Sequence, residues 1–400
     1  MVEWSGMVAV SCVWWFSVMA NVINVKPELI RWAVDRSGLS LADFPDAVQD
    51  WISKKKQPTF RKLEAFARKA MVPFGYLFLD QPPIETLPMP DYRTMRDKAI
   101  RRPSPNLLET IQDMQLRQAW MREYLVEEGH SPLPFVGSEG IKSGVLETVV
   151  SIRRWLKIEE DWANDQATWE DALSFLVRKI EAAGILVFTN GIVGNSTSRP
   201  LDPEEFRGFV FTDPIAPLIF VNGKDSKAAQ LFTLAHELVH IWIGEDALVN
   251  LLEMQPASDD CEKFCNRVAA EFLVPAAKLK AAWPGVNQQP SPLKKLARRF
   301  KVSPIVVARR AKDLKLITTD EFFAFYHSYM DKVQRERKAR KGGGDFYRTQ
   351  NARLGRRFGR AVIAAAEAGR VSYQQAFDLT RLYGSTFDRY AAFLKQQERR

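Results

Sequence analysis

Cysteine and histidine are scarce in this chain of 400 residues, which contains three cysteines and four histidines. The odd, small number of cysteines argues against a disulfide-stabilised fold and favours a reducing compartment, so we expect a cytoplasmic protein. Internal repeats are also lacking. Hydrophobic residues make up 46% and charged residues 26% of the chain, as in ordinary globular proteins.

The apolar run at residues 7–23 lacks the basic residues that precede an export signal, since the stretch before it carries Glu3 and neither lysine nor arginine. It is also short and poorly flanked for a membrane-spanning helix. An export signal, a membrane segment and a later translation start at Met19 are the three interpretations of this run. We favour the start at Met19, which makes residues 1–18 a non-native extension and implies no membrane partner.

Basic residues exceed acidic ones and give a net charge of +9. Such an excess fits an acidic partner, most simply nucleic acid, but a solvated basic surface explains it equally well. The charge alone therefore does not decide whether the protein binds nucleic acid.

The chain is too long for one ordinary core, which predicts two or three domains. Helical periodicity dominates, except in a proline-rich stretch, in a segment with short β-branched runs, and in a basic run that ends in three glycines. The expected segments are a helical module at 19–80, a proline-rich linker at 81–103, a helical connecting region at 104–183, a domain with a small sheet at 184–331, a hinge at 332–344 and a helical C-terminal region at 345–400.

Short apolar runs bounded by Gly, Pro, Asn and Asp predict strands at 184–188, 208–213 and 217–222. A helix follows them directly, with Ser226 as its N-cap, and a second helix is expected over 259–275. The sequence therefore predicts an α+β fold that is mainly helical, with a small sheet between helical N- and C-terminal parts.

The helical module at 19–80 contains short helices joined by tight turns, with the basic residues Lys54, Lys55 and Lys56 in one turn. This pattern is typical of a DNA-binding helix-turn-helix. The alternative is a helical bundle that binds no DNA, and it is favoured by Pro45 and the acidic residues near it, where a recognition helix should start.

His236, Glu237 and His240 form an H-E-x-x-H motif within an apolar helix. Residues i and i+4 of a helix lie one above the other, so both imidazoles can bind one tetrahedral zinc ion. Glu237 would then lie beside the open coordination position, where it could accept a proton from a metal-activated water and protonate the leaving amine. Two of the four histidines fall in this motif, which argues against coincidence.

A third protein ligand is expected on the helix at 259–275, and the residues alone leave several candidates open. These are Asp259, Asp260, Cys261, Glu262, Cys265 and Glu271. Thiolates bind zinc well, although Cys265 is more simply explained as a small apolar filler of the helix interior. No residue is singled out for oxyanion stabilisation, because Asn266 and Arg267 can both be purely structural.

Several stretches form motifs that belong together: LIRWAVDRSGLSL (29–41), QPTFRKLEAFA (57–67), VPFGYLFLDQPP (72–83), LPMPDYRT (87–94), FTLAHELVHIW (232–242), CNRVAAEFLVP (265–275) and GGGDFYRTQNARLGRRFGRAV (342–362). In these motifs the chain resembles the ImmA/IrrE family of metallo-endopeptidases, in the long form with an XRE-like helix-turn-helix in front. It departs from the family at Cys265, where alanine is usual, and at 44–51, which lacks the Gln/Ser/Arg pattern of a DNA-reading helix.

The resemblance implies a zincin-like peptidase domain at 184–331 and an XRE-like module at 19–80. It implies a zinc ion (Zn2+) bound by His236, His240 and a glutamate on the following helix, with Glu237 as catalytic base. In the family this glutamate lies four residues before the asparagine of N-x-x-A-A, a position that Glu262 occupies here. Family members cut XRE-type repressors and so switch on stress or mobile-element genes, which makes a repressor the implied protein substrate.

The sequence therefore favours a zinc-dependent, site-specific endopeptidase that acts in transcription regulation. Two alternatives stay open. One is a DNA-binding regulator in which the zincin-like module is not catalytic, and the other is a toxin–antitoxin or mobile-element protein that binds a partner through its N-terminal module. The scissile bond, the activating signal and the oligomeric state do not follow from the sequence.

Overall fold

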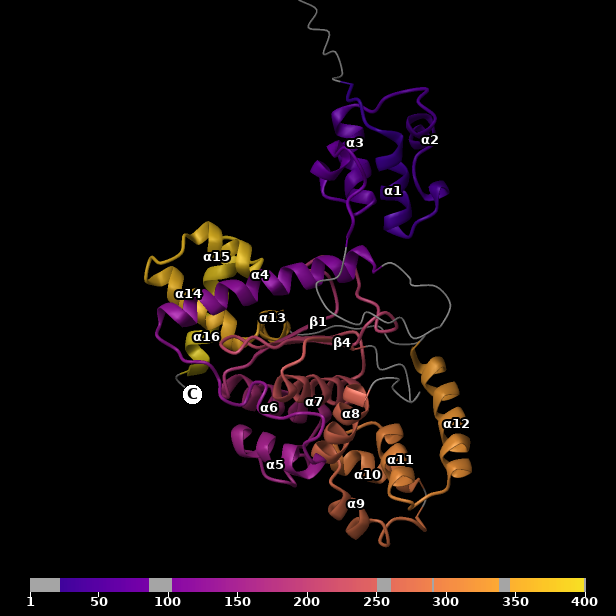
Figure 1. Ribbon diagram of the computed structural model, residues 1–400, viewed down its shortest axis with the longest axis vertical. Coiled ribbons are helices and arrows are strands. Elements are labelled where there is room, and N and C mark those ends of the chain that lie inside the picture. The colour runs from indigo at the N-terminus through magenta and orange to yellow at the C-terminus, as the bar shows by residue number, and fades with distance from the viewer. Residues whose placement is uncertain (1–21, 86–102, 250–259, 290, 338–345, 399–400) are drawn as a thin grey trace, which may run out of the picture. The chain divides into compact units, whose positions relative to one another are not determined.

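The computed structural model describes residues 22–85, 103–249, 260–289, 291–337 and 346–398 (Figure 1). Its contacts divide the chain into two compact units, Met1–Thr86 and Leu87–Arg400. Residues 1–18, and most of the linker expected at 81–103, lie outside the described residues. Among the described helices, none combines the length and the apolar character needed to cross a bilayer.

The first unit is a small bundle of short helices. Its elements are α1 (Pro27–Ser37), the 3-10 helix η1 (Leu41–Asp43), α2 (Ala47–Ile52), α3 (Phe60–Lys69) and the 3-10 helix η2 (Phe74–Phe78). The ring of Phe66 lies in its core, with ring centroids 5.3 Å from Phe44 and 5.8 Å from Trp51. Aromatic packing of this kind holds such short helices together, since helices of this length are not stable alone.

The second unit is built on a four-stranded sheet with the strand order β1-β3-β2-β4. The strands are β1 (Leu186–Asn190), β2 (Gly208–Phe211), β3 (Leu218–Asn222) and β4 (Ala247–Val249). β1 and β3 are parallel, whereas β2 is antiparallel to both β3 and β4. The strands predicted from the apolar runs are thus present, and β4 is the strand that the sequence did not indicate, because three residues are too few to show alternation.

The helices of the second unit cover both faces of this sheet (Figure 1). They are α4 (Pro105–Glu127), α5 (Val145–Leu156), α6 (Trp169–Ala182), α7 (Lys227–Ile243), α8 (Asp260–Leu273), α9 (Ala276–Ala282), α10 (Pro292–Phe300), α11 (Pro304–Asp313), α12 (Thr319–Arg337), α13 (Phe346–Leu354), α14 (Arg356–Glu367), α15 (Tyr373–Thr380) and α16 (Ser385–Glu398). The predicted α+β fold, mainly helical with a small sheet, is confirmed.

Two hydrophobic cores share the sheet, because successive side chains of a strand point to opposite faces. In β3, Ile219 and Val221 belong to the core that contains α7 and α8. Leu218 and Phe220 belong to the other core, with α4 and α14. Each core therefore combines segments that are far apart in the sequence.

The segments expected at 104–183 and 332–344 look different in the structure. Helices α5 and α6 pack into the same core as α7, whereas α4 packs into the opposite one, so the connecting region does not form a layer of its own.

Helix α12 continues to Arg337, so residues 332–337, expected to open the hinge, are helical. Lys, Arg, Gln and Glu all favour helix, which explains why a basic run extends α12.

Candidate metal centre

Helix α7 carries the H-E-x-x-H motif through the middle of the second unit. It begins after Ser226, whose hydroxyl accepts a hydrogen bond from the Ala229 N–H at 3.2 Å, as expected for an N-cap. It ends at Gly244, which has a left-handed φ of 81°. Between these ends the helix lies between the sheet and α8, so His236, Glu237 and His240 are all buried.

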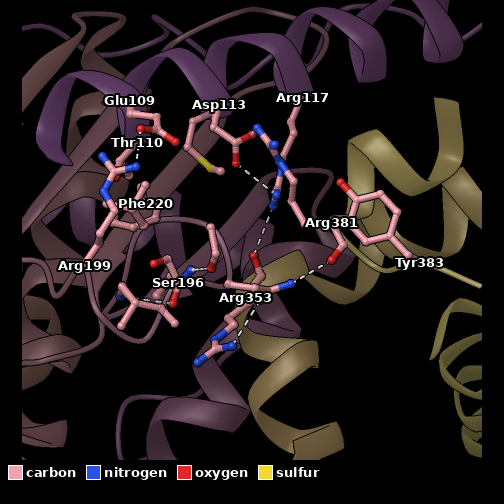
Figure 2. A pocket seen from close by; sticks show the side chains of 16 residues that line it. Glu109, Thr110, Asp113, Arg117, Ser196, Arg199, Phe220, Arg353, Arg381 and Tyr383 are labelled. Atoms are coloured by element: carbon pink, nitrogen blue, oxygen red, sulfur yellow. Dashed lines mark hydrogen bonds and ion pairs between the residues drawn. The ribbon is translucent and has the colours of Figure 1, made fainter. Parts of the chain in front are cut away.

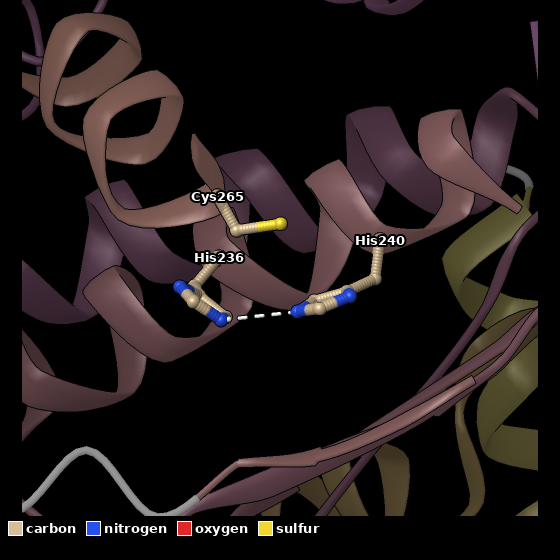
Figure 3. A group of neighbouring side chains, drawn as sticks. All are labelled: His236, His240 and Cys265. Carbon is tan, nitrogen blue, oxygen red and sulfur yellow. Dashed lines mark hydrogen bonds between the residues drawn. The ribbon is translucent and has the colours of Figure 1, made fainter. Parts of the chain in front are cut away.

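Three side-chain donors converge on one point between α7 and α8. The Nε2 atoms of His236 and His240 point toward each other and lie 3.2 Å apart, with the two ring planes tilted by 54° (Figure 3). One Glu262 oxygen lies 3.2 Å from His236 Nε2, and the other lies 3.2 Å from His240 Nε2. The structure therefore brings the two motif histidines together with the glutamate that the family resemblance implied.

This arrangement fits a tetrahedral metal ion. Nitrogen and oxygen ligands lie about 2.0–2.2 Å from zinc, which places neighbouring ligands of a tetrahedron about 3.3 Å apart. The nitrogen–nitrogen distance is 3.2 Å, close to that value, and each Glu262 oxygen lies 3.2 Å from one of the two nitrogens, so the carboxylate faces both imidazoles. Two imidazoles and one carboxylate also form the donor set of catalytic zinc sites, which keep a fourth position free.

Each ligand candidate has a perturbed pKa. Burial lowers the pKa of His236. Burial also opposes protonation of His240, but Cys261 and the carboxylates of Glu262 and Glu237 together raise its pKa to about 10. Burial would raise the pKa of Glu262, yet the two imidazoles outweigh it and hold this pKa well below its usual range. Glu262 is therefore an ionised carboxylate at neutral pH, which is the form that binds metals.

Glu237 is fully buried, and neither of its oxygens has a hydrogen-bond partner among the described residues. Burial raises its pKa well above the usual value. The carboxylate lies against Gly208 at the start of β2, where an added Cβ would approach Glu237 Oε1 to 2.7 Å. A buried carboxylate without a partner is costly, which is typical of a group held ready for a reaction.

The thiol of Cys265 is a second candidate for the third ligand, because it also lies near the two imidazoles. Its Sγ and the ligand nitrogens of His236 and His240 all lie within 4.8 Å of one another (Figure 3). Glu262 nevertheless makes the closer approach to both rings, with both distances at 3.2 Å. Cys261 is also buried in this region, one helical turn before Cys265.

Other candidates from the helix at 259–275 make different contacts. Asp260 points to solvent, with 82% of its side chain exposed, and pairs with Lys263 at 2.9 Å. Glu271 forms a buried ion pair with Arg310 at the far end of α8. Asp259 lies outside the described residues, and the side chain of Arg267 is exposed. Asn266 lies near His236, where it opposes the lowering of that imidazole's pKa by burial.

The remaining residues singled out from the sequence lie away from this centre. Lys54, Lys55 and Lys56 are exposed in the turn after α2 of the first unit, with Lys56 3.4 Å from Asp50. His130 and His327 are exposed side chains of the second unit. The residue that sequence reasoning missed is Gly208, because nothing in the run GFVF shows which side chain the glycine will face.

Comparison with known proteins places a peptidase-family domain around this centre. Residues 181–312 match the model of a peptidase family described as the IrrE N-terminal-like domain. Residues 354–393 match a domain of unknown function, and no curated protein matches the chain. The first match spans the whole of α7 and α8. Residues 181–312 therefore form a domain of the IrrE N-terminal-like peptidase family, and His236, His240 and Glu262 lie inside this domain.

Proposed function

We propose that this protein is a zinc-dependent endopeptidase that cleaves a regulatory protein, an XRE-type transcriptional repressor. The observation that carries the proposal is the meeting of His236, His240 and Glu262 at 3.2 Å spacings beside the buried Glu237. Three protein donors and one neighbouring carboxylate are the components of a hydrolytic zinc site.

Zinc is the metal that this donor set favours. Imidazole nitrogens suit zinc, copper, iron and nickel, whereas magnesium and calcium prefer oxygen-only sites. When bound, zinc acidifies a coordinated water and polarises the carbonyl group of the peptide. His236, His240 and Glu262 would hold the ion from two helices, α7 and α8, whose buried contact fixes the spacing of the donors.

Glu237 would move the protons of the reaction. Its Oε atoms have no competing hydrogen-bond donor among the described residues, so they are available to accept a proton from the attacking water. The raised pKa set by burial then favours holding that proton until the leaving amine takes it. Gly208 leaves the space that this carboxylate occupies.

The repressor as substrate is supported by the family resemblance and by the helical unit that precedes the peptidase domain. Cleavage of a transcription factor places the reaction in the cytoplasm and makes its consequence a change in gene expression, as in a stress response. The module at 26–80 would contribute to substrate recognition, since an XRE-like shape can pair with a repressor of the same class.

The test compares wild-type full-length protein with Glu237→Gln and with the matched control Glu170→Gln, an exposed glutamate of α6. Purified XRE-type repressors from the same genome are the substrates, and product termini are sequenced. We expect one zinc per chain in all three proteins, and cleavage by the wild type and Glu170→Gln only. Cleavage by Glu237→Gln at the wild-type rate, or a wild type that binds no zinc, would contradict the proposal.

Binding of duplex DNA by the first unit is a second proposal, and it is supported by the exposure of Lys54, Lys55 and Lys56. Because neutralised phosphates release counterions, such binding should weaken steeply as salt rises. A fluorescence anisotropy titration with a mixed duplex at low and physiological salt tests it, with Lys54→Gln/Lys55→Gln as the comparison. Absence of binding at low salt would remove this proposal and leave the peptidase proposal intact.

A further inference from the structure

A cavity of about 250 Å³ lies at the junction of three chain segments in the second unit (Figure 2). Its walls come from the first turns of α4, from the loop at 190–199 after β1, and from the C-terminal segments that carry Arg353 and Arg381. Phe220 of β3 also lines it, with its ring in the core on the sheet face opposite α7. The cavity is therefore separate from the metal centre.

We propose that this cavity binds a small metabolite through an oxyanion, a phosphate or a carboxylate group. Four arginines line it, Arg117, Arg199, Arg353 and Arg381, against two carboxylates, Glu109 and Asp113. The walls thus carry an excess of two positive charges in a partly enclosed space. Guanidinium groups are the side chains that best match the planar, bidentate geometry of oxyanions.

Both carboxylates already pair with arginines of the cavity. Asp113 pairs with Arg117 at 3.0 Å and with Arg381 at 3.1 Å. Glu109 pairs with Arg199 at 2.5 Å. Arg353 is left with a neutral acceptor, Asn195 Oδ1 at 3.1 Å, and has no carboxylate partner among the described residues.

Two guanidinium nitrogens at the cavity are buried donors without an acceptor. They are Nε of Arg117 and Nη2 of Arg199, counted over the described part of the chain. Arg117 is 4% exposed, although its other nitrogens reach Asp113 and the carbonyl of Arg353. A buried charged donor without an acceptor costs free energy, and an anion in the cavity would supply the missing acceptors.

The size and lining of the cavity favour a small molecule over a peptide or a nucleic acid. Ligand pockets range over roughly 300–1,000 Å³, so about 250 Å³ lies just below the small end. Phe220 and Tyr383 supply aromatic surface, and Thr110 and Ser196 supply hydroxyls. Tyr383 is 56% exposed, which leaves a side of the cavity open to solvent.

The competing explanation is a purely structural network that joins the three segments. Such a network gains most when every buried charged group has a partner, and the two guanidinium nitrogens without an acceptor depart from that rule. The two explanations differ in one measurable respect. Only a binding site is stabilised by an added oxyanion in a saturable way.

The experiment is calorimetric titration of the full-length protein with inorganic phosphate in one arm and acetate in the other, at constant ionic strength set with potassium chloride. Thermal unfolding under the same conditions gives a second readout. The variants are Arg353→Gln and Arg199→Gln, and the control is Arg122→Gln, an arginine of α4 that pairs with Asp213 outside the cavity. Unfolding in chloride alone shows that each variant folds.

We expect saturable binding of phosphate or acetate, with a matching rise in Tm, by the wild type and Arg122→Gln. Removal of one charge-assisted hydrogen bond should weaken this binding roughly tenfold or more in both cavity variants. A response to phosphate assigns a phosphorylated ligand, and a response to acetate alone assigns a carboxylate. No saturable binding of either anion by the wild type, or unchanged binding in both cavity variants, would overturn the proposal.

Discussion

Gly208 and Glu237 occupy adjacent space: a Cβ atom on Gly208 would lie 2.7 Å from Glu237 Oε1, closer than carbon and oxygen normally approach. The same Cβ would lie 2.7 Å from Thr233 Cγ2 and 2.9 Å from the carbonyl oxygen of Phe220. The conformation of the proposed general base therefore depends on the absence of a side chain in the neighbouring strand.

We expect Gly208→Ala to displace the Glu237 carboxylate while leaving the three metal donors in place. Misplacement of a reacting group by about 1 Å costs roughly 100-fold in rate, and overpacking costs about 1–3 kcal/mol in stability. Zinc content and kcat/KM on the repressor substrate measure the two effects separately. Gly140→Ala is the control, because nothing lies within 4 Å of its added Cβ, and full activity of Gly208→Ala would refute the assignment.

The assignments of Glu262 and of Cys265 as third ligand predict opposite zinc contents for the corresponding alanine variants. If Glu262 completes the site, Glu262→Ala and His240→Ala lose zinc during purification in buffer without added metal, whereas Cys265→Ala keeps one zinc per chain. Plasma mass spectrometry of the three variants decides between the two residues. Zinc retained in Glu262→Ala and lost in Cys265→Ala would move the third ligand to the thiol.

Glu271 is predicted to stabilise the fold without binding metal. Its carboxylate forms a buried ion pair with Arg310 of α11 and accepts a hydrogen bond at 3.2 Å from the Ala276 N–H. Removal of one partner of a buried pair typically costs about 3–5 kcal/mol. Denaturant unfolding of Glu271→Ala should show a loss of that order with the zinc content unchanged, and loss of zinc at full stability would contradict this role.

Glu181 should make the stability of the second unit depend on pH. Burial raises its pKa to about 7 from an ordinary 4.5, although Glu181 Oε1 accepts a hydrogen bond from the Arg357 N–H at 3.1 Å. Between these values the folded protein holds a proton that the unfolded chain has released. The contribution of protonated Glu181 to the free energy of unfolding is therefore fully present below pH 4.5 and is lost as the pH rises through 7.

Glu181→Gln keeps the acceptor oxygen and removes the charge. We expect this variant to gain on the order of 3 kcal/mol in the free energy of unfolding at pH 8, and much less at pH 5. Urea unfolding at the two pH values provides the comparison, and the measurement at pH 5 serves as the internal control. An equal effect at both pH values would mean that Glu181 ionises at its ordinary pKa.

The sequence alone predicted the H-E-x-x-H residues of the site, but not the residues of other elements that surround them. His236, Glu237 and His240 were predictable because helical spacing alone places them on adjacent turns. Glu262 was one of several carboxylates until the family resemblance singled it out, since spacing within α8 does not show which side chain reaches α7. Gly208 depends on strand register and tertiary packing, so no local pattern indicates it.

The organisation of the second unit was less predictable for a related reason. The runs that became β1, β2 and β3 are visible in the sequence, but their order in the sheet depends on contacts between distant segments. The same holds for the cavity. Arg117 and Arg381 are far apart in the sequence, yet both form ion pairs with Asp113. Helical periodicity indicates that each helix has a buried face but not which neighbour covers it.

Phe220 borders both the arginine-rich cavity and the surroundings of Glu237, the first with its side chain and the second with its backbone carbonyl group. Its ring lines the arginine-rich cavity, and its carbonyl oxygen belongs to the wall that a side chain at position 208 would strike. The sheet is a single layer of backbone, so the strand that borders the cavity on one face also borders the metal centre on the other face. Phe220 therefore borders the cavity with its ring and, with its carbonyl oxygen, the space beside Gly208 that the Glu237 carboxylate also borders.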